Sequence, residues 1–393
     1  MLQPISAGIV ASITGFATSF ALVVAGLQAV GATDAQASSG LLILCVTVGL
    51  SSMTYAWIYR IPISTAWSTP GAALLVAAGQ NHANFAGAVG AFVVCGALIV
   101  LCGLWPALGR LVTSIPRPIA SAMLAGILFP ICLAPVTAMI DFPLLALPIV
   151  LVWLVMFRLA PRWAVPAAML AATVVIAISA GGSWLQQAEL APQVEFVLPV
   201  FDPVVIASLG LPLFIVTMAG QNVPGFVVMS TFGYTAPPRS VLVGTGVASA
   251  AGAVFGGHAI NLAAITAAIM ASPEADPDKS RRWIATFSAG IVYLLLGLGA
   301  GVATALVAAS PPILIIAVAG LAVLGALVTS ITGALEEPPH RITAIATFLV
   351  TASGLTLVGI GSAFWGLLTG ALFMAWLGWG RRAASAVDDA PAP

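Results

Sequence analysis

Charged residues are scarce in this 393-residue chain, which has 12 Lys and Arg, 12 Asp and Glu, and a formal net charge of zero. They make up 6% of the residues, whereas about 25% are charged in a soluble globular protein. Hydrophobic residues make up 61%, and the mean hydropathy is +1.14. The composition excludes an ordinary soluble domain and predicts a protein embedded in a lipid bilayer. Because there is no basic tract, nucleic acid is not an expected partner.

Cysteine and histidine are also rare. The four cysteines lie inside apolar runs, so we expect small buried side chains rather than a disulfide framework or a metal site. The predicted spans contain no paired acids, no nucleophile with its base and no Gly-rich phosphate loop. An embedded enzyme is therefore disfavoured, and neither a cofactor nor a metal is expected. The N-terminus also lacks the basic region of a cleavable signal peptide.

Apolar runs predict twelve full membrane spans, and two shorter segments, 61–78 and 256–272, look discontinuous. In each short segment we expect extended backbone followed by a half-helix, which survives in a bilayer only where protein covers it or a cavity borders it. The total is fourteen crossings. The full spans are 5–31, 40–59, 85–104, 118–139, 143–158, 163–180, 203–225, 240–255, 283–308, 311–331, 342–359 and 362–379.

The basic residues agree with fourteen crossings. If the N-terminus is cytoplasmic, every Lys and Arg falls on the cytoplasmic side and none falls outside, as the positive-inside rule requires. These residues are Arg60, Arg110, Arg117, Arg158, Arg162, Arg239, Lys279, Arg281, Arg282, Arg341, Arg381 and Arg382. The pattern predicts that both termini lie in the cytoplasm.

Two stretches of the chain are related by an offset of 194 residues. Ala25–Gly31 resembles Ala219–Gly225, and the same offset places Ser64 on His258. Because seven spans per half is an odd number, the two halves must insert with opposite orientation. This is the inverted-repeat plan of secondary transporters, whose sites lie between broken helices at the membrane midplane.

The stretch Phe255–Ala271 is the expected centre of the binding site. Gly256 and Gly257 precede His258, and a half-helix is expected to follow with Asn261 one turn inside it. The free N–H groups and positive dipole end of a half-helix favour an anion. As an intramembrane ionisable residue, His258 either carries a coupled proton or is a neutral side chain that locks the broken helix.

Other polar residues near the two breaks are candidates for substrate contact, namely Gln28, Ser64, Thr65, Ser68, Thr69, Gln221 and Asn222. Gln221 and Asn222 either bind substrate or satisfy carbonyls freed by Pro224. Asn261 either binds substrate or caps its half-helix. For residues 64–69, helix capping is the preferred interpretation for most hydroxyls, with one reaching the substrate.

Four further residues have two interpretations each. Tyr234 either contacts a substrate ring or anchors the protein at the membrane interface. Asp202, Glu336 and Glu337 are alternative proton carriers, but they lie at span ends, where a solvated terminus is the simpler account.

Three motifs resemble the bacterial benzoate/proton symporter family, often called BenE: AGQNVPG at Ala219–Gly225, Gly233-Tyr234, and GGHAIN at Gly256–Asn261. The resemblance covers essentially the whole chain. It implies an all-α polytopic membrane protein with seven-plus-seven inverted repeats, shared with nucleobase/cation symporters and sulfate-type anion transporters. Short strands would precede the half-helices of segments 3 and 10, which are the two short segments 61–78 and 256–272. A core domain from residues 1–104 and 200–308 would move against a gate domain from 105–181 and 309–382.

The resemblance implies import of benzoate or a similar aromatic carboxylate with protons across the bacterial inner membrane, with a homodimer as one possible assembly. Nucleobase symporters of this fold place carboxylates in spans 8 and 10, where this chain has Gln221, Asn222, His258 and Asn261. A carboxylate there would repel a carboxylate substrate, whereas amides and imidazole donate to one. A nucleobase or an inorganic anion is the alternative substrate.

Overall fold

The computed structural model describes residues 2–79, 84–105, 107–108, 115–179 and 190–388, and helices dominate it. Arg110, one of the residues expected on the cytoplasmic side, lies outside the described residues. The first part contains α1 (Leu2–Ala29), α2 (Asp34–Tyr59), β1 (Thr65–Trp67), α3 (Thr69–Ala78), α4 (Phe85–Leu104), α6 (Arg117–Asp141), α7 (Pro143–Leu159), η2 (Pro161–Trp163) and α8 (Ala164–Ser179).

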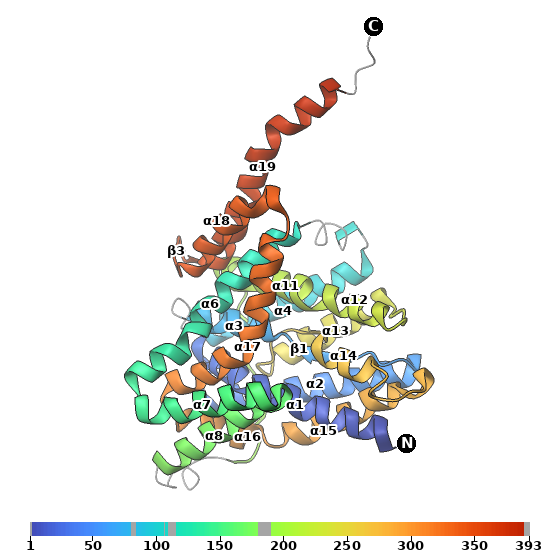
Figure 1. Cartoon of the computed structure of the whole chain (residues 1–393), viewed down its shortest axis with the longest axis vertical. Helices are drawn as coiled ribbons and strands as arrows, with labels where there is room; N and C mark the ends of the chain where they lie inside the picture. Colours follow the sequence, from blue (N-terminus) through green and yellow to red (C-terminus); the bar gives the residue numbers. More distant parts are fainter. Residues whose placement is uncertain (1, 80–83, 106, 109–114, 180–189, 389–393) are drawn as a thin grey trace.

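The second part begins with one helical run, α10 (Pro203–Val205), η3 (Ile206–Gly210), α11 (Leu211–Thr217), η4 (Met218–Asn222) and α12 (Val223–Thr231). It continues with α13 (Pro238–Ala253), β2 (Ile260–Leu262), α14 (Ile265–Ala271), η5 (Lys279–Arg281), α15 (Trp283–Gly297) and α16 (Ala300–Ala308). The last elements are α17 (Pro312–Leu335), η6 (Pro338–His340), α18 (Arg341–Ala352), β3 (Thr356–Leu357), β4 (Ile360–Gly361) and α19 (Ser362–Asp388), which projects from the body in Figure 1.

Helices cover all or most of each of the twelve predicted full spans. In the described part of the chain, six helices are long and apolar enough to cross a membrane, or seven if the bent pair α15–α16 forms one span. Four shorter apolar helices are α3, α7, α8 and the first part of α19. The protein is thus mainly helical, and the count of fourteen crossings stays a prediction.

Two predicted spans are not continuous helices. The span predicted over 283–308 is bent by 55° between α15 and α16, where Gly297 and Gly299 weaken the helix. In the span predicted over 342–359, the helix ends at Ala352 and a short hairpin of β3 and β4 follows. Gly354 adopts a positive φ angle just after the helix, and a residue in this conformation ends a helix. Gly359 adopts a positive φ angle in the turn of the hairpin.

The helical run from 203 to 231 contains two π-helical turns, η3 and η4. Pro212 and Pro224 each follow one of these turns by two residues. Because proline has no N–H, it cannot donate to the carbonyl four residues earlier, and the helix widens locally to compensate. Such turns are frequent at functional sites, and η4 contains Gln221 and Asn222.

The two interrupted segments meet near the middle of the fold, where β1 pairs with β2 in antiparallel register (Figure 1). The central pair is Ala66 with Asn261. The Ser68 N–H donates to the carbonyl of Ala259 at 2.9 Å, and the Ala263 N–H donates to that of Ser64 at 2.8 Å. The expectation of a short strand followed by a half-helix in each segment is confirmed.

The expected position of Asn261 is wrong. It lies in β2 and not one turn inside a half-helix, since α14 begins only at Ile265. The reason is non-local, because β1 supplies partners for the backbone of residues 259–263 and holds it extended. The paired residues Ala66 and Asn261 are 261 − 66 = 195 positions apart in the chain, one more than the offset of the sequence motifs.

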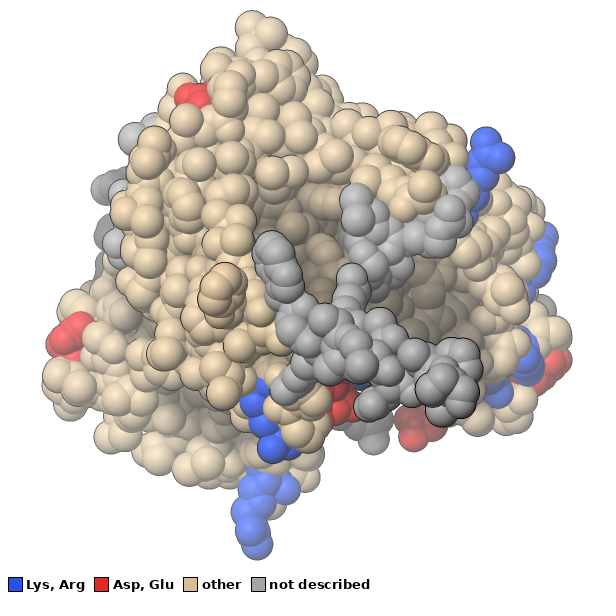
Figure 2. Space-filling model, turned by 90° about the horizontal axis from the view of Figure 1, so that it is seen from above, with Lys and Arg blue, Asp and Glu red and all other residues tan. Residues whose placement is uncertain are grey.

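The helices pack in two groups. Around the paired strands, α1, α2 and α15 pack together, α13 packs on α4, and α3 packs on α1. In the second group α6 packs on α17, α18 and α19. The groups touch through α3 with α6 and through α1 with α17. The outer surface is apolar, with exposed residues such as Leu144 and Trp376, and Figure 2 shows one face that is mostly uncharged, as a lipid environment requires.

Candidate functional site

Ser68 begins the half-helix α3. Its Oγ accepts a hydrogen bond from the Gly71 N–H at 3.1 Å and another from the Thr217 hydroxyl of α11 at 2.9 Å. All three residues are buried. The predicted capping role is therefore confirmed for Ser68, and the cap also joins α3 to the helical run of residues 203–231.

Thr65 and Ser64 bind to protein groups. The Thr65 hydroxyl donates to the Val48 carbonyl at 3.0 Å and lies 2.8 Å from the Ser52 hydroxyl, which also accepts from the Thr65 N–H. These contacts fasten β1 to α2. The Ser64 hydroxyl lies 3.5 Å from that of Thr266 in α14. Ser64 and Thr65 thus hold the two broken segments in place.

Asn222 fastens β2. Its Oδ1 accepts a hydrogen bond from the Leu262 N–H at 2.8 Å, and its side chain is fully buried. The Ile260 N–H donates to the Ser249 hydroxyl of α13 at 2.9 Å. Asn222 therefore satisfies a strand amide, whereas the sequence suggested substrate or carbonyls freed by Pro224.

His258 and Asn261 carry buried polar atoms without partners. In the described structure, neither ring nitrogen of His258 has a hydrogen-bond partner, and the ring lies edge-on to Phe92 of α4 at 6.4 Å. The Asn261 Nδ2 donates to the Leu262 carbonyl at 3.0 Å, while its Oδ1 has no partner among the described residues. Unpaired buried polar atoms cost about 1–3 kcal/mol each. Their presence marks β2 and the residues just before it as a place for a proton, water or ligand.

A few side chains at the centre remain partly exposed. They are Phe16, Ala66, Thr69 and Gln221, and the last makes no side-chain hydrogen bond within the described residues. The Phe16 ring stacks on Phe20 at 5.0 Å and meets the edge of Trp67 at 6.0 Å. An amide, a hydroxyl and an aromatic ring are thus accessible close to the paired strands.

The backbone of η4 also meets the second helix group here. A Cβ atom built on Gly220 would lie 3.5 Å from Leu124 of α6 and 3.7 Å from Pro70 of α3. Gly220 is the residue before Gln221, so this turn of η4 lies where α3 and α6 approach it. The candidate site therefore lies between the two packing groups.

The structure does not bring Gln28 to this place. Its Nε2 donates to Asp34 at 2.8 Å, at the turn between α1 and α2. A Cβ on Gly79, at the far end of α3, would lie 2.5 Å from Ala29. Gln28 is thus separated from Ser68 by roughly the length of α3, about 15 Å at 1.5 Å per residue.

The motif residue Tyr234 anchors a loop. Its hydroxyl donates to the Lys279 carbonyl at 2.9 Å, and the Lys279 ammonium lies 4.7 Å from the centre of its ring. Arg282 lies three residues after Lys279 and is buried. It donates to the carbonyls of Ala271 at 2.8 Å and Asp276 at 2.7 Å. Because Ala271 ends α14, Arg282 caps the C-terminal end of this half-helix.

The sequence analysis missed several residues that build the site: Phe16, Ser19, Ser52, Thr217, Ser249 and Thr266. Ser19 accepts a hydrogen bond from the Trp67 indole at 2.9 Å. Hydroxyls in membrane helices commonly bond to their own helix, as Ser12 does with the Gly8 carbonyl. No local signal distinguishes those that reach another element.

Known proteins resemble this chain over most of its length. The family described as "Benzoate membrane transport protein" (BenE) matches residues 1–376. The Inner membrane protein YdcO of Escherichia coli K12 is 44% identical over 365 residues, 93% of each chain. The Benzoate membrane transport protein of Acinetobacter baylyi is 34% identical over 317 residues, covering 80% of this chain and 79% of the relative.

Solved structures share the fold. The transmembrane domain of the cyanobacterial bicarbonate transporter BicA has a TM-score of 0.58 at 16% identity, covering 94% of this chain and 98% of BicA's domain. The inward-facing murine anion transporter Slc26a9 has a TM-score of 0.63 at 15% identity, covering 95% of this chain and 68% of its own. At this identity the likeness concerns the fold alone. Taken with the sequence match, it identifies the chain as a member of the benzoate membrane transport protein family, BenE.

Proposed function

We propose that this protein is a secondary active transporter that imports benzoate or a similar aromatic carboxylate together with protons, by alternating access. The family, and the relative from Acinetobacter baylyi named as a benzoate membrane transport protein, support this substrate class. The shared fold with anion transporters supports a site for a negative group.

The observation that carries the proposal is the half-buried amide of Gln221, which has no hydrogen-bond partner among the described residues and follows Gly220, the residue that approaches Pro70 at the start of α3. In our proposal Gln221 donates to the substrate carboxylate, and the positive end of α3 adds to the attraction. Thr69, the first residue of α3, supplies a second donor. Phe16 packs against the benzoate ring, an edge or stacked contact worth about 0.5–1.5 kcal/mol beyond burial.

Five other candidates then support the site and do not bind the substrate. They are Ser64, Thr65, Ser68, Asn222 and Asn261. The Thr65 hydroxyl and the amide of Asn222 hold the strands through hydrogen bonds to protein groups, and the Ser68 hydroxyl caps α3. They keep the ends of the half-helices at fixed positions, which preorganises the site for an anion. Gln28 is not included, because it bonds to Asp34 at the end of α1.

His258 is our proposed proton carrier. It is buried, both of its nitrogens lack partners in the described structure, and it lies two residues before β2, the strand that Asn222 holds from η4. The three alternative proton carriers already have other roles. Asp202 caps α10, Glu336 pairs with Arg117 at 3.1 Å, and Glu337 lies 2.8 Å from His340.

The alternating movement would involve the two helix groups. We assign residues 1–104 and 200–308 to a core domain and residues 105–181 and 309–382 to a gate domain, as parts of fourteen segments in two inverted halves. The antiparallel pairing about Ala66 and Asn261 is the arrangement expected of such halves. A homodimer and cytoplasmic termini belong to the same proposal.

Proteoliposomes with an acidic exterior test the function. The expected result is accumulation of labelled benzoate that exceeds the accumulation in protein-free liposomes, which measures passive entry of neutral benzoic acid. A protonophore should abolish the excess. Equal accumulation with and without the protein would refute benzoate transport.

An inorganic anion is the second candidate, because one structural neighbour is a bicarbonate transporter. A competition assay distinguishes benzoate from an inorganic anion as the substrate. Excess bicarbonate, sulfate or uracil should leave benzoate uptake unchanged, whereas substituted benzoates should compete. Strong inhibition by bicarbonate would favour the inorganic anion.

A further inference from the structure

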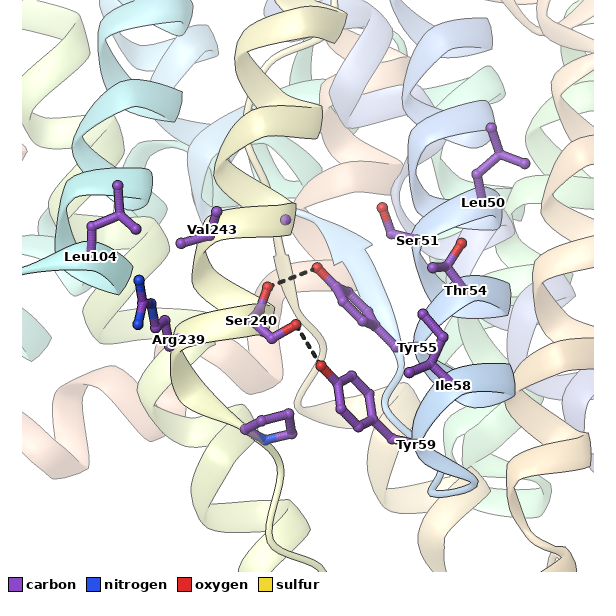
Figure 3. A pocket seen from close by; sticks show the side chains of 12 residues that line it. Leu50, Ser51, Thr54, Tyr55, Ile58, Tyr59, Leu104, Arg239, Ser240 and Val243 are labelled. Carbon is purple, nitrogen blue, oxygen red and sulfur yellow. Dashed lines mark hydrogen bonds between the residues drawn. The ribbon is translucent and has the colours of Figure 1, made fainter.

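A groove of about 750 Å³ lies outside the candidate site, between α2, the end of α4 and the start of α13 (Figure 3). Leu50 and Ile58 of α2 and Leu104 of α4 border it, and half or more of the surface of each is exposed. Arg239, Ser240 and Val243 border it from α13. In a membrane, a groove with exposed apolar borders on its outer side faces lipid.

Aromatic residues indicate the depth of the groove in the bilayer. The Arg60 guanidinium lies 4.2 Å from the ring centres of both Trp57 and Trp283. Tryptophan with an adjacent basic residue is typical of the headgroup region of a membrane. Tyr59, in the groove, lies between Trp57 and Arg60 in the chain, so this end of the groove is at headgroup level.

The charged group of the groove lies at this end, and the other end is less polar, with the Ser51 and Thr54 hydroxyls beside Leu50 (Figure 3). At the polar end the Tyr59 hydroxyl donates to the Ser240 hydroxyl at 2.7 Å, and Arg239 is exposed (Figure 3). At the less polar end are Leu50 and Val243. Tyr59 is nine positions after Leu50 in α2, which is about 14 Å along the helix. That is close to half the ~30 Å hydrocarbon thickness, the depth of one leaflet.

The charge at the polar end is positive and uncompensated within the described residues. The Arg239 side chain makes no ion pair or hydrogen bond to any of them. Arg239 is the second residue of the 16-residue helix α13, whose start has no side-chain cap. A guanidinium beside an uncapped helix start is complementary to a phosphate group.

We propose that this groove binds one anionic phospholipid of the adjacent leaflet. The phosphate lies against Arg239 and the start of α13, and an acyl chain lies along Leu50, Thr54 and Val243. A benzoate ion would occupy only the polar end and would leave the less polar half unfilled. The lipid bridges α2 and α13, the helices whose Ser52 and Ser249 hold β1 and β2.

Native mass spectrometry of the full chain in detergent, with phosphatidylglycerol or phosphatidylcholine added, tests the proposal. The wild type should retain phosphatidylglycerol preferentially. Arg239→Gln should weaken its binding about five-fold, the effect of one basic residue at a membrane surface. Thr54→Trp, which fills the groove from an exposed position, should weaken it at least as much. The matched control is Arg158→Gln, an exposed arginine at the end of α7, which should bind as the wild type does.

Three results would overturn the proposal: equal retention of both lipids, equal phosphatidylglycerol binding by Arg239→Gln and Arg158→Gln, or displacement of the lipid by millimolar benzoate. The last would indicate a second site for small acids. Melting temperatures in lipid-free detergent show whether each variant is folded. If Thr54→Trp is unfolded, the comparison of the two arginine variants decides.

Discussion

Replacing Gln221 by Glu tests the electrostatics of the proposed site without a change of shape. The two side chains have nearly the same size, so packing between η4, α3 and α6 is preserved. The change removes a donor and adds a negative charge beside the substrate carboxylate. Two unit charges about 4 Å apart repel by ~4 kcal/mol at an effective dielectric constant of ~20. Because ~1.4 kcal/mol is a factor of ten, benzoate should bind roughly two to three orders of magnitude more weakly.

Isothermal titration of the purified protein with benzoate measures this loss. Gln221→Leu, which removes the donor but adds no charge, should weaken binding about ten-fold or more, the value of one hydrogen bond to a charged group. The expected order of affinity for benzoate, from tightest to weakest, is wild type, the Leu variant and the Glu variant. If the Glu variant binds benzoate as tightly as the wild type while its melting temperature is unchanged, Gln221 does not face the substrate.

Three further changes probe the proton and the framework. His258→Ala should abolish pH-driven accumulation of benzoate in proteoliposomes while leaving benzoate exchange, and unchanged accumulation would exclude His258 as the carrier. Ser68→Ala removes a helix cap worth about 1 kcal/mol and leaves the buried Thr217 hydroxyl without this partner, so the melting temperature should fall; an unchanged value would show that the cap is dispensable. Arg282→Gln removes charged donors to the Ala271 and Asp276 carbonyls, each worth about 1.5–3 kcal/mol, so amide hydrogen exchange should increase in α14 and not in α17. Equal increases in both helices would point to global destabilisation.

Most of the fold could be predicted from hydropathy and from helix-breaking residues. The apolar runs predicted where helices lie, because each run satisfies its backbone locally within one helix. Proline and glycine marked the interruption at residues 61–78, and two glycines marked the one at 256–272. The two π-helical turns also had a local signal, since Pro212 and Pro224 each follow one of them.

Contacts between distant residues were not predictable in the same way. The extended state of Asn261 depends on β1, which lies 195 residues earlier in the chain, since 261 − 66 = 195. A local reading of small and apolar residues therefore favoured a helix. The hydroxyls of Ser52 and Thr217 face other elements for the same non-local reason.

The repeat motif was misleading for Gln28. Ala25–Gly31 matches Ala219–Gly225 in letters, but the two stretches have different places in their helices. The first ends α1 and reaches Gly31 with φ 97°, whereas the second lies within the helical run of residues 203–231. Equal letters in an Ala- and Gly-rich chain do not fix equal depth in the membrane.

The position of a bound substrate tests the central claim most directly. A structure of the protein with 4-bromobenzoate locates both ends of the ligand, because bromine marks the ring end. We expect the carboxylate within hydrogen-bond distance of the Gln221 amide near the start of α3, and the ring against Phe16. A ligand bound elsewhere, such as in the groove beside Arg239, would contradict the account.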